Sequence, residues 1–264
     1  MGGALTGGAG MIRQRPVALV TGARRGIGFA IARALADKGF DLAITDREHD
    51  EAAMKELRQT DRKIIFFESD LADIDRHEAS VAAVVCEFGG IDCLVNNAGM
   101  GSVERDDFLK LKPENFDTIM NVNLRGTVFF TQAVVRAMLA AAEVPFARSI
   151  TTISSVSSVM TSPERLDYCI SKAGLSAFVQ GLALRLAEAR IGVFEVRPGI
   201  IRTDMTAKVA DRYDRLIEAG LVPMKRWGEA GDVGAVVAAL AGGDFIFATG
   251  STIHADGGLS IAKL

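Results

Sequence analysis

The stretch "VALVTGARRGIG" (residues 17–28) places a glycine-rich turn between an apolar run and a segment with helical spacing. The run "VALV" is typical of a strand that is buried on both faces. Gly22 allows a tight turn, while Gly26 and Gly28 leave room for a pyrophosphate at the start of the helix. The spacing differs from the usual G-x-G-x-x-G fingerprint, so a plain turn remains the alternative.

Similar apolar runs recur along the chain and alternate with helical patterns. The runs lie at residues 17–20, 41–45, 63–67, 92–95, 149–153, 192–196 and 251–255. This alternation predicts one α/β domain over residues 14–264, with a doubly wound, seven-stranded parallel sheet and helices on both faces. The longest helical pattern predicts a long helical stretch over roughly residues 115–141.

Composition excludes several classes of protein. The chain has 264 residues, 49% of them hydrophobic and 24% charged, which suits one domain with a sizeable core. A net charge of -3 does not favour a nucleic-acid-binding protein, and no apolar run approaches the length of a membrane span. The three cysteines form no C-x-x-C pair, which favours a reducing compartment, here the cytoplasm. The three histidines are scattered, so no metal site is expected.

The first residues, "MGGALTGGAG", are small and lack the basic start and apolar stretch of a secretion signal. We therefore expect a flexible tail over residues 1–13. Gly2 and Thr6 fit the permissive pattern for myristoylation, but a single acyl chain anchors a protein only marginally.

Polar residues follow the predicted strands, at the edge where ligands bind to doubly wound sheets. Asp46 ends the second strand, 18 residues after Gly28, where an acid typically binds the adenosine ribose; a solvated turn is the alternative. Asp70 ends the third strand and could meet an adenine amino group or cap a helix. The small residues of "NNAG" (96–99) allow a ligand to approach the backbone, and Asn97 can tie neighbouring loops together.

Tyr168 and Lys172, in "YCISK", lie four residues apart and so share one face of a predicted helix. An ammonium about 4 Å away would stabilise a phenolate by roughly 4 kcal/mol at an effective dielectric of 20. That is about three pKa units, enough to bring a tyrosine from near 10 to near 7 and make it a general acid–base. A tyrosine and a lysine that merely share a helix surface are the alternative.

The neighbouring sequence favours the catalytic interpretation. Ser155 follows the fifth strand, 13 residues before Tyr168, and a hydroxyl there can bind a substrate carbonyl or alkoxide. In "RPGIIRTDM" (197–205), Pro198 and Gly199 would turn the chain after the sixth strand.

With these motifs together, residues 14–260 resemble the short-chain dehydrogenases/reductases. The resemblance rests on "TGARRGIG", "NNAG", "NVNLRG", Ser155, "YCISK", "RPGIIRTDM" and "HADGG". It implies a single-domain Rossmann fold and four catalytic residues. These are Tyr168 as acid–base, Lys172 as the group that lowers its pKa and holds the nicotinamide ribose, Ser155 as stabiliser of the substrate oxygen, and Asn123 as part of a water relay. A buried structural asparagine is the alternative for Asn123.

The resemblance also implies which residues bind the cofactor. They are Gly22, Arg25, Ile27, Gly28, Asp46, Arg47, Asp70, Leu71, Asn97, Ala98, Gly99, Tyr168, Lys172, Pro198, Gly199, Ile201 and Thr203. Asp46 would accept hydrogen bonds from the ribose hydroxyls and repel a 2′-phosphate, whereas Arg25 and Arg47 could grip one. We predict a preference for NAD(H), with NADP(H) possible.

The predicted reaction interconverts a secondary alcohol and a ketone by hydride transfer. The chain is most similar to the 3-oxoacyl-carrier-protein reductase-like branch of the family, and a polyol or sugar-alcohol dehydrogenase is an alternative. A dinucleotide-binding regulator without catalysis is an alternative from another class. Residues 200–228 are expected to form a lid, with Ile200, Met205, Leu221, Met224 and Trp227 lining part of the pocket or packing in the core. The resemblance implies a homotetramer that pairs through residues 115–141 and 170–188.

Overall fold

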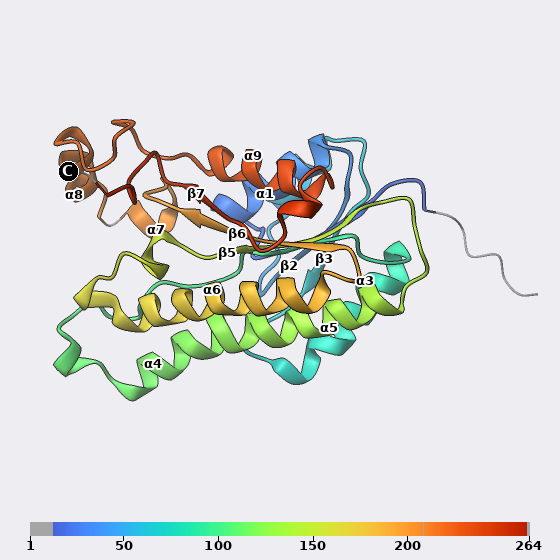
Figure 1. Ribbon diagram of the computed structural model, residues 1–264, viewed down its shortest axis with the longest axis horizontal. Helices are drawn as coiled ribbons and strands as arrows, with labels where there is room; N and C mark the ends of the chain where they lie inside the picture. The colour runs from blue at the N-terminus through green and yellow to red at the C-terminus, as the bar shows by residue number, and fades with distance from the viewer. Residues whose placement is uncertain (1–12, 208, 263–264) are drawn as a thin grey trace, which may run out of the picture.

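The predicted seven-stranded parallel sheet forms the centre of the computed structural model, which describes residues 13–207 and 209–262 (Figure 1). Its strands are β1 (Val17–Thr21), β2 (Asp41–Asp46), β3 (Ile64–Glu68), β4 (Cys93–Asn96), β5 (Arg148–Ile153), β6 (Ile191–Pro198) and β7 (Thr252–Ala255). They are ordered β3-β2-β1-β4-β5-β6-β7, and every neighbouring pair is parallel. The order reverses between β1 and β4, and ligands bind at such a switch point.

Helices cover both faces of the sheet, as predicted. One layer contains α1 (Gly26–Asp37), α2 (Glu51–Leu57) and α9 (Ala230–Ala241). The other contains α3 (His77–Phe88), α5 (Thr127–Ala140) and α6 (Leu166–Leu186), and α4 (Pro113–Ile119) leads into α5. Two short helices, α7 (Asp204–Ala207) and α8 (Ala210–Glu218), lie together at one end of the molecule, on the left of Figure 1.

Two apolar cores hold these layers together, one on each face of the sheet. Leu35 of α1 and Val237 of α9 pack against alternate residues of the central strands, such as Val20. On the opposite face, Phe130 of α5 and Val179 of α6 pack in a second cluster. Successive residues of a strand point to opposite faces, so a strand buried on both faces is apolar throughout.

The helix expected over residues 115–141 is divided by a π-helical segment, Met120–Gly126. The long helical stretch is therefore confirmed, but the hydrophobic period did not indicate its π-helical segment. The π turn contains Asn123, which is fully buried. Gly126 lies against the Leu71 carbonyl, where a Cβ would come within 2.2 Å of the oxygen. Segments of this kind are frequent at functional sites.

Arg13, the last residue of the expected tail, makes defined contacts with the start of the sheet. Arg13, which we assigned to the flexible tail, pairs with buried Asp92 through two contacts of 2.5 and 3.0 Å. Asp92 also accepts a hydrogen bond from the Val17 backbone at 2.8 Å, so Arg13 is attached to the start of β1. The rest of the tail, including Gly2 and Thr6, lies outside the described residues.

Within residues 13–207 and 209–262, no helix is both long and apolar enough to cross a membrane. Over the same residues, no three side chains of His, Cys, Asp or Glu are grouped as metal ligands. The three cysteines are free, and burial raises the pKa of the Cys93 thiol to about 12. Cys93 is therefore a packing residue rather than a nucleophile.

Candidate active site

The glycine turn between β1 and α1 is held in shape by close backbone contacts. Gly22 has a φ of +65°, and a Cβ on it would lie 2.7 Å from the Cα of Ala98. A Cβ on Gly28 would lie 2.2 Å from the Gly22 carbonyl oxygen and 2.4 Å from Nδ2 of Asn97. Asn97 donates from that nitrogen to the carbonyls of Thr21 and Gly22, both at 3.0 Å. The expected tie between the two loops is therefore present.

The same turn has the room that a dinucleotide needs. A Cβ on Gly26, which is exposed, would meet nothing closer than Thr203 at 3.7 Å. Gly99 is also exposed, and a Cβ on it would lie 3.2 Å from Oδ1 of Asn123 and 3.6 Å from Nζ of Lys172. The turn, the end of β4 and the catalytic candidates therefore border one strip of backbone that lacks side chains. Backbone N–H groups at the start of α1 complete an arrangement that fits a pyrophosphate.

We expect Gly28→Ala to destabilise the protein by about 2–3 kcal/mol, because its methyl group must displace backbone atoms and Asn97. The measurement is the free energy of unfolding in urea, together with the dissociation constant for NADH. Gly231→Ala is the control, because Gly231 is exposed in α9 and a Cβ there meets nothing within 4 Å. That control should change the free energy by less than about 1 kcal/mol. Equal stability of the two variants would contradict this view of the turn.

At the expected ribose position, Asp46 lies at the end of β2, and its Oδ1 accepts from the Arg47 backbone at 2.8 Å. The cation beside it is Arg24, which the sequence analysis did not single out. Arg24 lies 3.8 Å from Asp46 and 2.9 Å from Glu48. Arg25, which we expected could grip a 2′-phosphate, pairs with Asp204 of α7 at 3.0 Å. Arg47 is exposed.

Three other predicted cofactor residues are less available than expected. The side chains of Leu71 and Ile201 are buried in the two apolar cores, which leaves only their backbone for a ligand. Asp70 accepts a hydrogen bond from the Ala72 backbone at 2.9 Å, which is the capping role given as its alternative. Ile27 is partly buried against the α1 core. Pro198 and Gly199 end β6, and a Cβ on Gly199 would lie 2.8 Å from Asp256.

Ser155, Tyr168 and Lys172 meet at the carboxyl end of β5, as predicted. Ser155 follows the strand, and its hydroxyl hydrogen-bonds to the side chain of Tyr168. Tyr168 and Lys172 lie on α6, with Nζ of Lys172 5.7 Å from the centre of the tyrosine ring. That nitrogen also donates to the carbonyl of Ile153, at 3.1 Å.

Asn123 adjoins this group from the π-helical segment. Its amide accepts from the Met100 backbone at 2.8 Å and donates to the Met100 carbonyl at 2.9 Å. It also donates to the hydroxyl of Ser171 on α6, at 3.2 Å. Asn123 therefore ties the loop after β4 to the helix that carries the catalytic candidates. The structure thus shows a structural role, which the sequence analysis gave as the alternative; the water relay stays a prediction.

The pKa of Tyr168 is raised, contrary to the expected shift toward 7. Burial is the largest cause, and it outweighs the hydrogen bond from Ser155 and the positive charge of Arg165, 5.5 Å from the ring centre. Lys172 is not among the groups that lower the pKa of Tyr168, and burial lowers its own pKa to about 8. Without a ligand, Tyr168 therefore keeps its proton at neutral pH and can act as an acid.

Residues 200–228 form α7, α8 and their connections near this site. Thr203 faces Gly26, and Met205 faces Gly101, whose Cβ would lie 3.8 Å from the sulfur. Trp227, expected to line the pocket or to pack in the core, packs in a small core with Ile217 and Val222 and donates to Asp214 at 2.6 Å. Trp227 therefore packs in a core, and it also lines a pocket together with Arg202 and Arg226.

Comparison with known proteins agrees with this geometry. Residues 22–260 match the family model described as enoyl-(acyl carrier protein) reductase, a group of short-chain dehydrogenases/reductases. The chain belongs to this family, and it is an NAD(P)-dependent oxidoreductase. The family and the Rossmann fold expected from the sequence are both confirmed.

Within the family, the chain is similar to 3-oxoacyl-[acyl-carrier-protein] reductases. It is 36% identical over 252 residues to FabG of Haemophilus influenzae, covering 94% of this chain and 100% of that protein. It is 34% identical over 247 residues to FabG of Staphylococcus epidermidis, covering 92% and 98%. A crystal structure of 3-oxoacyl-[acyl-carrier protein] reductase from Brucella melitensis in complex with NAD is 84% identical, with a TM-score of 0.95, covering 96% of this chain and 100% of that one.

Proposed function

We propose that the protein reduces the ketone of a 3-oxoacyl thioester to a secondary alcohol, with Tyr168 as the proton donor. The observation that supports this most is the meeting of Ser155, Tyr168 and Lys172 beside the glycine turn. The raised pKa of Tyr168 keeps its proton in place at neutral pH, as a proton donor in the reduction requires. The similarity to 3-oxoacyl-[acyl-carrier-protein] reductases supports the choice of substrate.

In this mechanism the bound nicotinamide supplies or accepts a hydride, and the protein does the rest. Ser155 donates a hydrogen bond to the substrate oxygen and stabilises the charge that develops on it. Tyr168 gives its proton to that oxygen as the carbonyl becomes an alcohol. Lys172 holds the nicotinamide ribose and stabilises the resulting phenolate with its positive charge. Asn123 would link Lys172 to solvent, so that Tyr168 can be reprotonated.

A turnover screen tests the proposed substrate. The purified protein is mixed with NADH or NADPH and a 3-oxoacyl thioester, carried on acyl carrier protein or on coenzyme A. In parallel it is mixed with NAD or NADP and a panel of polyols and sugar alcohols. We expect the highest kcat/KM with a 3-oxoacyl thioester. Faster oxidation of a polyol would show that the proposed substrate is wrong but would keep the class of reaction. No turnover with any of these compounds would favour a dinucleotide-binding regulator without catalysis.

We propose NAD(H) as the preferred cofactor, with NADP(H) accepted less well. Asp46 has the position that faces the ribose, and a carboxylate there repels a 2′-phosphate. Arg24 would otherwise attract that phosphate, but it is paired with Glu48 and lies near Asp46. Arg25 is likewise paired with Asp204. Two of the nearby arginines are therefore already neutralised by acids, which leaves exposed Arg47 as the remaining cation.

The expected result is a higher kcat/KM with NADH than with NADPH, measured with one substrate. Asp46→Ala should move this ratio toward NADPH by about tenfold or more, which corresponds to about 1.4 kcal/mol. Arg24→Ala is the companion variant and should leave the preference for NADH in place. If the wild type prefers NADPH and only Arg24→Ala changes the ratio, the arginine decides specificity and the proposal is wrong.

Residues 200–228 are proposed to close over the substrate, because Thr203 already faces Gly26 of the glycine turn and Met205 faces Gly101 of the loop after β4. We expect hydrogen exchange of residues 200–207 to slow when NADH and a substrate analogue bind together. Helix α3, which belongs to the core on the other side of the sheet from α1, is the internal control and should not change. Unchanged exchange in residues 200–207 would contradict a lid.

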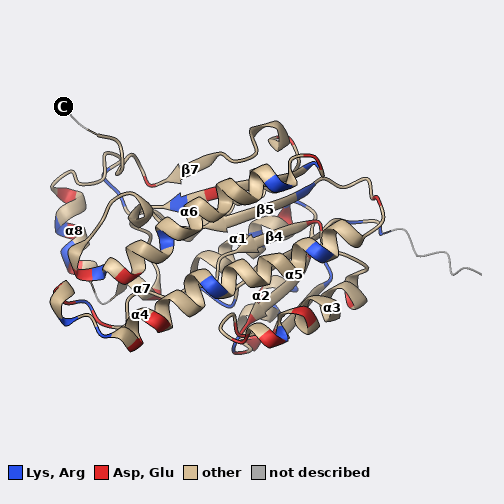
Figure 2. Cartoon of the chain, turned by 60° about the horizontal axis from the view of Figure 1, so that its bottom comes forward, with Lys and Arg blue, Asp and Glu red and all other residues tan. Residues whose placement is uncertain are grey.

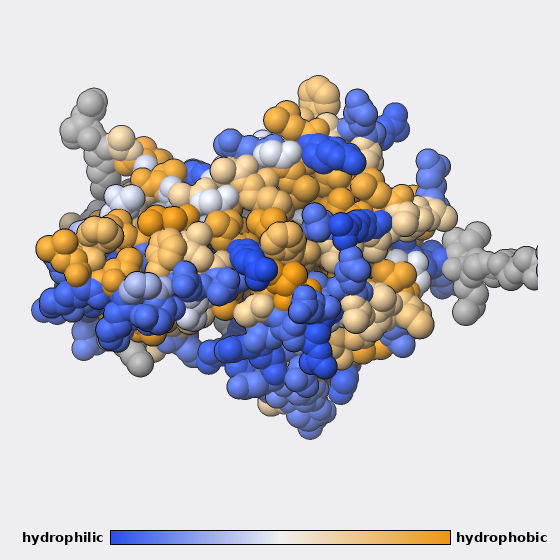
Figure 3. All heavy atoms as spheres, turned by 90° about the horizontal axis from the view of Figure 1, so that it is seen from below, coloured by the Kyte–Doolittle hydropathy of each residue, from blue (hydrophilic) through white to orange (hydrophobic). Residues whose placement is uncertain are grey.

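We also propose a homotetramer. Apolar side chains gather on the face that α5 and α6 form (Figure 3), where Phe129 and Leu139 of α5 and Ile170 and Leu184 of α6 are exposed. An exposed apolar face of this kind marks an interaction surface. Sedimentation as a monomer at micromolar concentration would contradict the assembly. A cytoplasmic location stays a prediction.

A carrier protein is acidic in many cases and would need a basic surface near the site. Figure 2 shows acidic and basic residues interspersed along α8, rather than a face of one sign. Near the site, Arg202 is paired with Glu229, and Arg226 is paired with Asp232. This is why the screen includes coenzyme A thioesters beside those of the carrier protein.

A further inference from the structure

A buried carboxylate lies in the sheet beneath the site. Glu195 is in β6 and is 1% exposed. Ile191 and Val193, four and two residues before it on the same face of the strand, pack in the apolar core with Val179 of α6. The next residue on this face would be expected to be apolar as well. A buried charge is unfavourable unless it is paired and hydrogen-bonded, so Glu195 needs an explanation.

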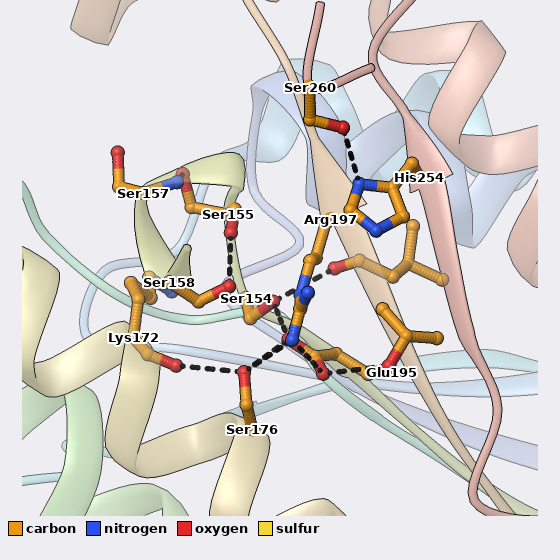
Figure 4. A network of polar contacts seen from close by, with 12 residues as sticks. Ser154, Ser155, Ser157, Ser158, Lys172, Ser176, Glu195, Arg197, His254 and Ser260 are labelled. Carbon is orange, nitrogen blue, oxygen red and sulfur yellow. Dashed lines mark hydrogen bonds and ion pairs between the residues drawn. The ribbon is translucent and has the colours of Figure 1, made fainter. Parts of the chain in front are cut away.

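The carboxylate is fully engaged by its neighbours (Figure 4). Oε1 accepts hydrogen bonds from the hydroxyl of Ser154, from that of Ser176 at 2.6 Å and from Nε of Arg197 at 2.8 Å. Oε2 accepts from Nη2 of Arg197 and from the hydroxyl of Thr252, both at 3.1 Å. Burial raises the pKa of Glu195, but these hydrogen bonds outweigh it and leave the pKa below its ordinary value. The side chain is therefore an anion at neutral pH.

The two oxygens reach different parts of the fold. Oε1 contacts Ser154, the residue before Ser155, and Ser176, one helical turn after Lys172 on α6. Besides Arg197, Oε2 contacts only Thr252 of β7, which carries none of the catalytic candidates. Oε1 thus connects the end of β5 to α6, the two elements that must meet in the active site. Oε2 connects β6 to β7 at the edge of the sheet.

A second contact joins the same two elements. Nζ of Lys172 donates to the carbonyl of Ile153, the last residue of β5, at 3.1 Å. The hydroxyl of Ser176 also lies 3.4 Å from the carbonyl of Lys172. The end of β5 and the middle of α6 are therefore connected through Lys172 itself and through Glu195.

Glu195 also provides charge for Lys172. Lys172 is buried, and Glu195 is the negative group that acts against the loss of its proton. Tyr168 on α6 also lies beside Lys172, Arg197 on β6 lies beside Glu195, and Asn123 of the π-helical segment is uncharged. Among these groups, Glu195 is the one whose negative charge favours the protonated form of Lys172.

We propose that Glu195 is a positioning residue, which holds Ser155 of the β5 end against Tyr168 and Lys172 of α6 through Ser154 and Ser176. This rests on the proposed function, because it assigns those three residues to catalysis. Glu195 touches no reacting atom and acts through other residues. Its negative charge adds a second effect, on the proton of Lys172.

The test compares one variant on each side of the carboxylate. Ser176→Ala removes the contact of Oε1 with α6, and Thr252→Val removes the contact of Oε2 with β7. We expect Ser176→Ala to lower kcat on the order of tenfold, because small displacements of catalytic groups are costly. Thr252→Val should keep kcat within about twofold, although each variant loses a partly buried hydrogen bond to the same carboxylate. Ser176→Ala also loses the contact with Nη2 of Arg197, so the loss of stability is measured for both variants. The free energy of unfolding is measured for each, so that stability and catalysis are separated.

Glu195→Gln tests the charge. The amide fills the same space but carries no charge, and we expect a lower kcat. Lys172 should lose its proton more easily in this variant, so the decline of NADH affinity with rising pH should begin about one pH unit lower than in the wild type. Glu195→Asp keeps the charge and should restore the pH dependence of the affinity but not the full kcat. If Glu195→Gln does not fold, Ser154→Ala replaces it as the second variant on Oε1.

Equal kcat for Ser176→Ala and Thr252→Val, or a wild-type kcat in Glu195→Gln, would overturn the proposal and leave Glu195 with a role in stability alone. The pH dependence of NADH binding is measured as a dissociation constant, which does not require turnover of a substrate. If the wild type reduces no 3-oxoacyl thioester, the proposed function fails while the effect of Glu195 on Lys172 can still be measured.

Discussion

Replacement of Tyr168 by phenylalanine should lower kcat by about 10²–10⁴-fold, the usual contribution of general acid–base catalysis. The variant keeps the ring, which packs near Arg165 and Lys172, and loses only the hydroxyl that donates the proton. The dissociation constant for NADH should therefore stay within about twofold of the wild type. The measurements are steady-state kinetics with a 3-oxoacyl thioester and a fluorescence titration with NADH.

The chain offers a matched control, because Tyr213 is its only other tyrosine. Tyr213 lies on α8 and packs edge-on against Trp227, with ring centres 5.8 Å apart. Tyr213→Phe makes the same chemical change away from the β5 edge and should keep kcat near that of the wild type. Near-wild-type turnover in Tyr168→Phe, or an equal loss in both variants, would contradict the assignment of Tyr168.

The second large effect is expected for Lys172→Ala, which should lower kcat by about 100-fold and weaken NADH binding by about tenfold or more. Both losses are expected because one ammonium is proposed to stabilise the phenolate of Tyr168 and to hold the nicotinamide ribose. Lys63→Ala is the control, since Lys63 lies at the start of β3 and pairs with Glu87. It should affect neither quantity.

The pH dependence of NADH binding separates these roles from a loss of packing. The pKa of Lys172 in the cofactor-free protein is lowered to about 8 by burial, so its charge is present below that pH and is lost above it. The advantage of the wild type over Lys172→Ala in NADH affinity should therefore be largest below pH 8 and diminish above it. An advantage that stays constant from pH 6 to pH 10 would indicate packing rather than charge.

The fold could be predicted because its signals are local. Each of the seven apolar runs forms a strand within one or two residues of its expected bounds, because strands buried on both faces must be apolar throughout. In a parallel sheet the residues that follow the strands all lie at the same edge. For this reason the sequence alone could predict that Ser155 and Tyr168 lie together.

The remaining features depend on packing in three dimensions. The run "GVFEV" indicated a strand, but nothing in it reveals that Glu195 is buried or that Ser154, Ser176 and Thr252 converge on it. The pKa of Tyr168 was predicted in the wrong direction because one cation was weighed and burial was not. The arginine that lies beside Asp46 is Arg24, whereas Arg25 pairs with Asp204. The sequence does not indicate which of the two neighbouring arginines points toward Asp46.

The pocket assignment of Trp227 shows a further limit. Its apolar character suits a lid as well as a core, and the sequence left both open. The structure places it against Ile217 and Val222, where its indole nitrogen reaches Asp214. The same ambiguity applies to the exposed apolar residues of α5 and α6. From the sequence alone, residues of a subunit interface on these helices could not be told from residues of the core.

The central claim is that this chain transfers a hydride to a ketone while Tyr168 supplies the proton. The most direct measurement follows NADH that carries deuterium at the reactive position of its nicotinamide, in a reaction with a 3-oxoacyl thioester, and locates the label by mass spectrometry and NMR. The account predicts deuterium on the new carbinol carbon, none acquired there from solvent, and far slower labelling by Tyr168→Phe. A product whose carbinol hydrogen comes from solvent, or equal labelling by the variant, would contradict it.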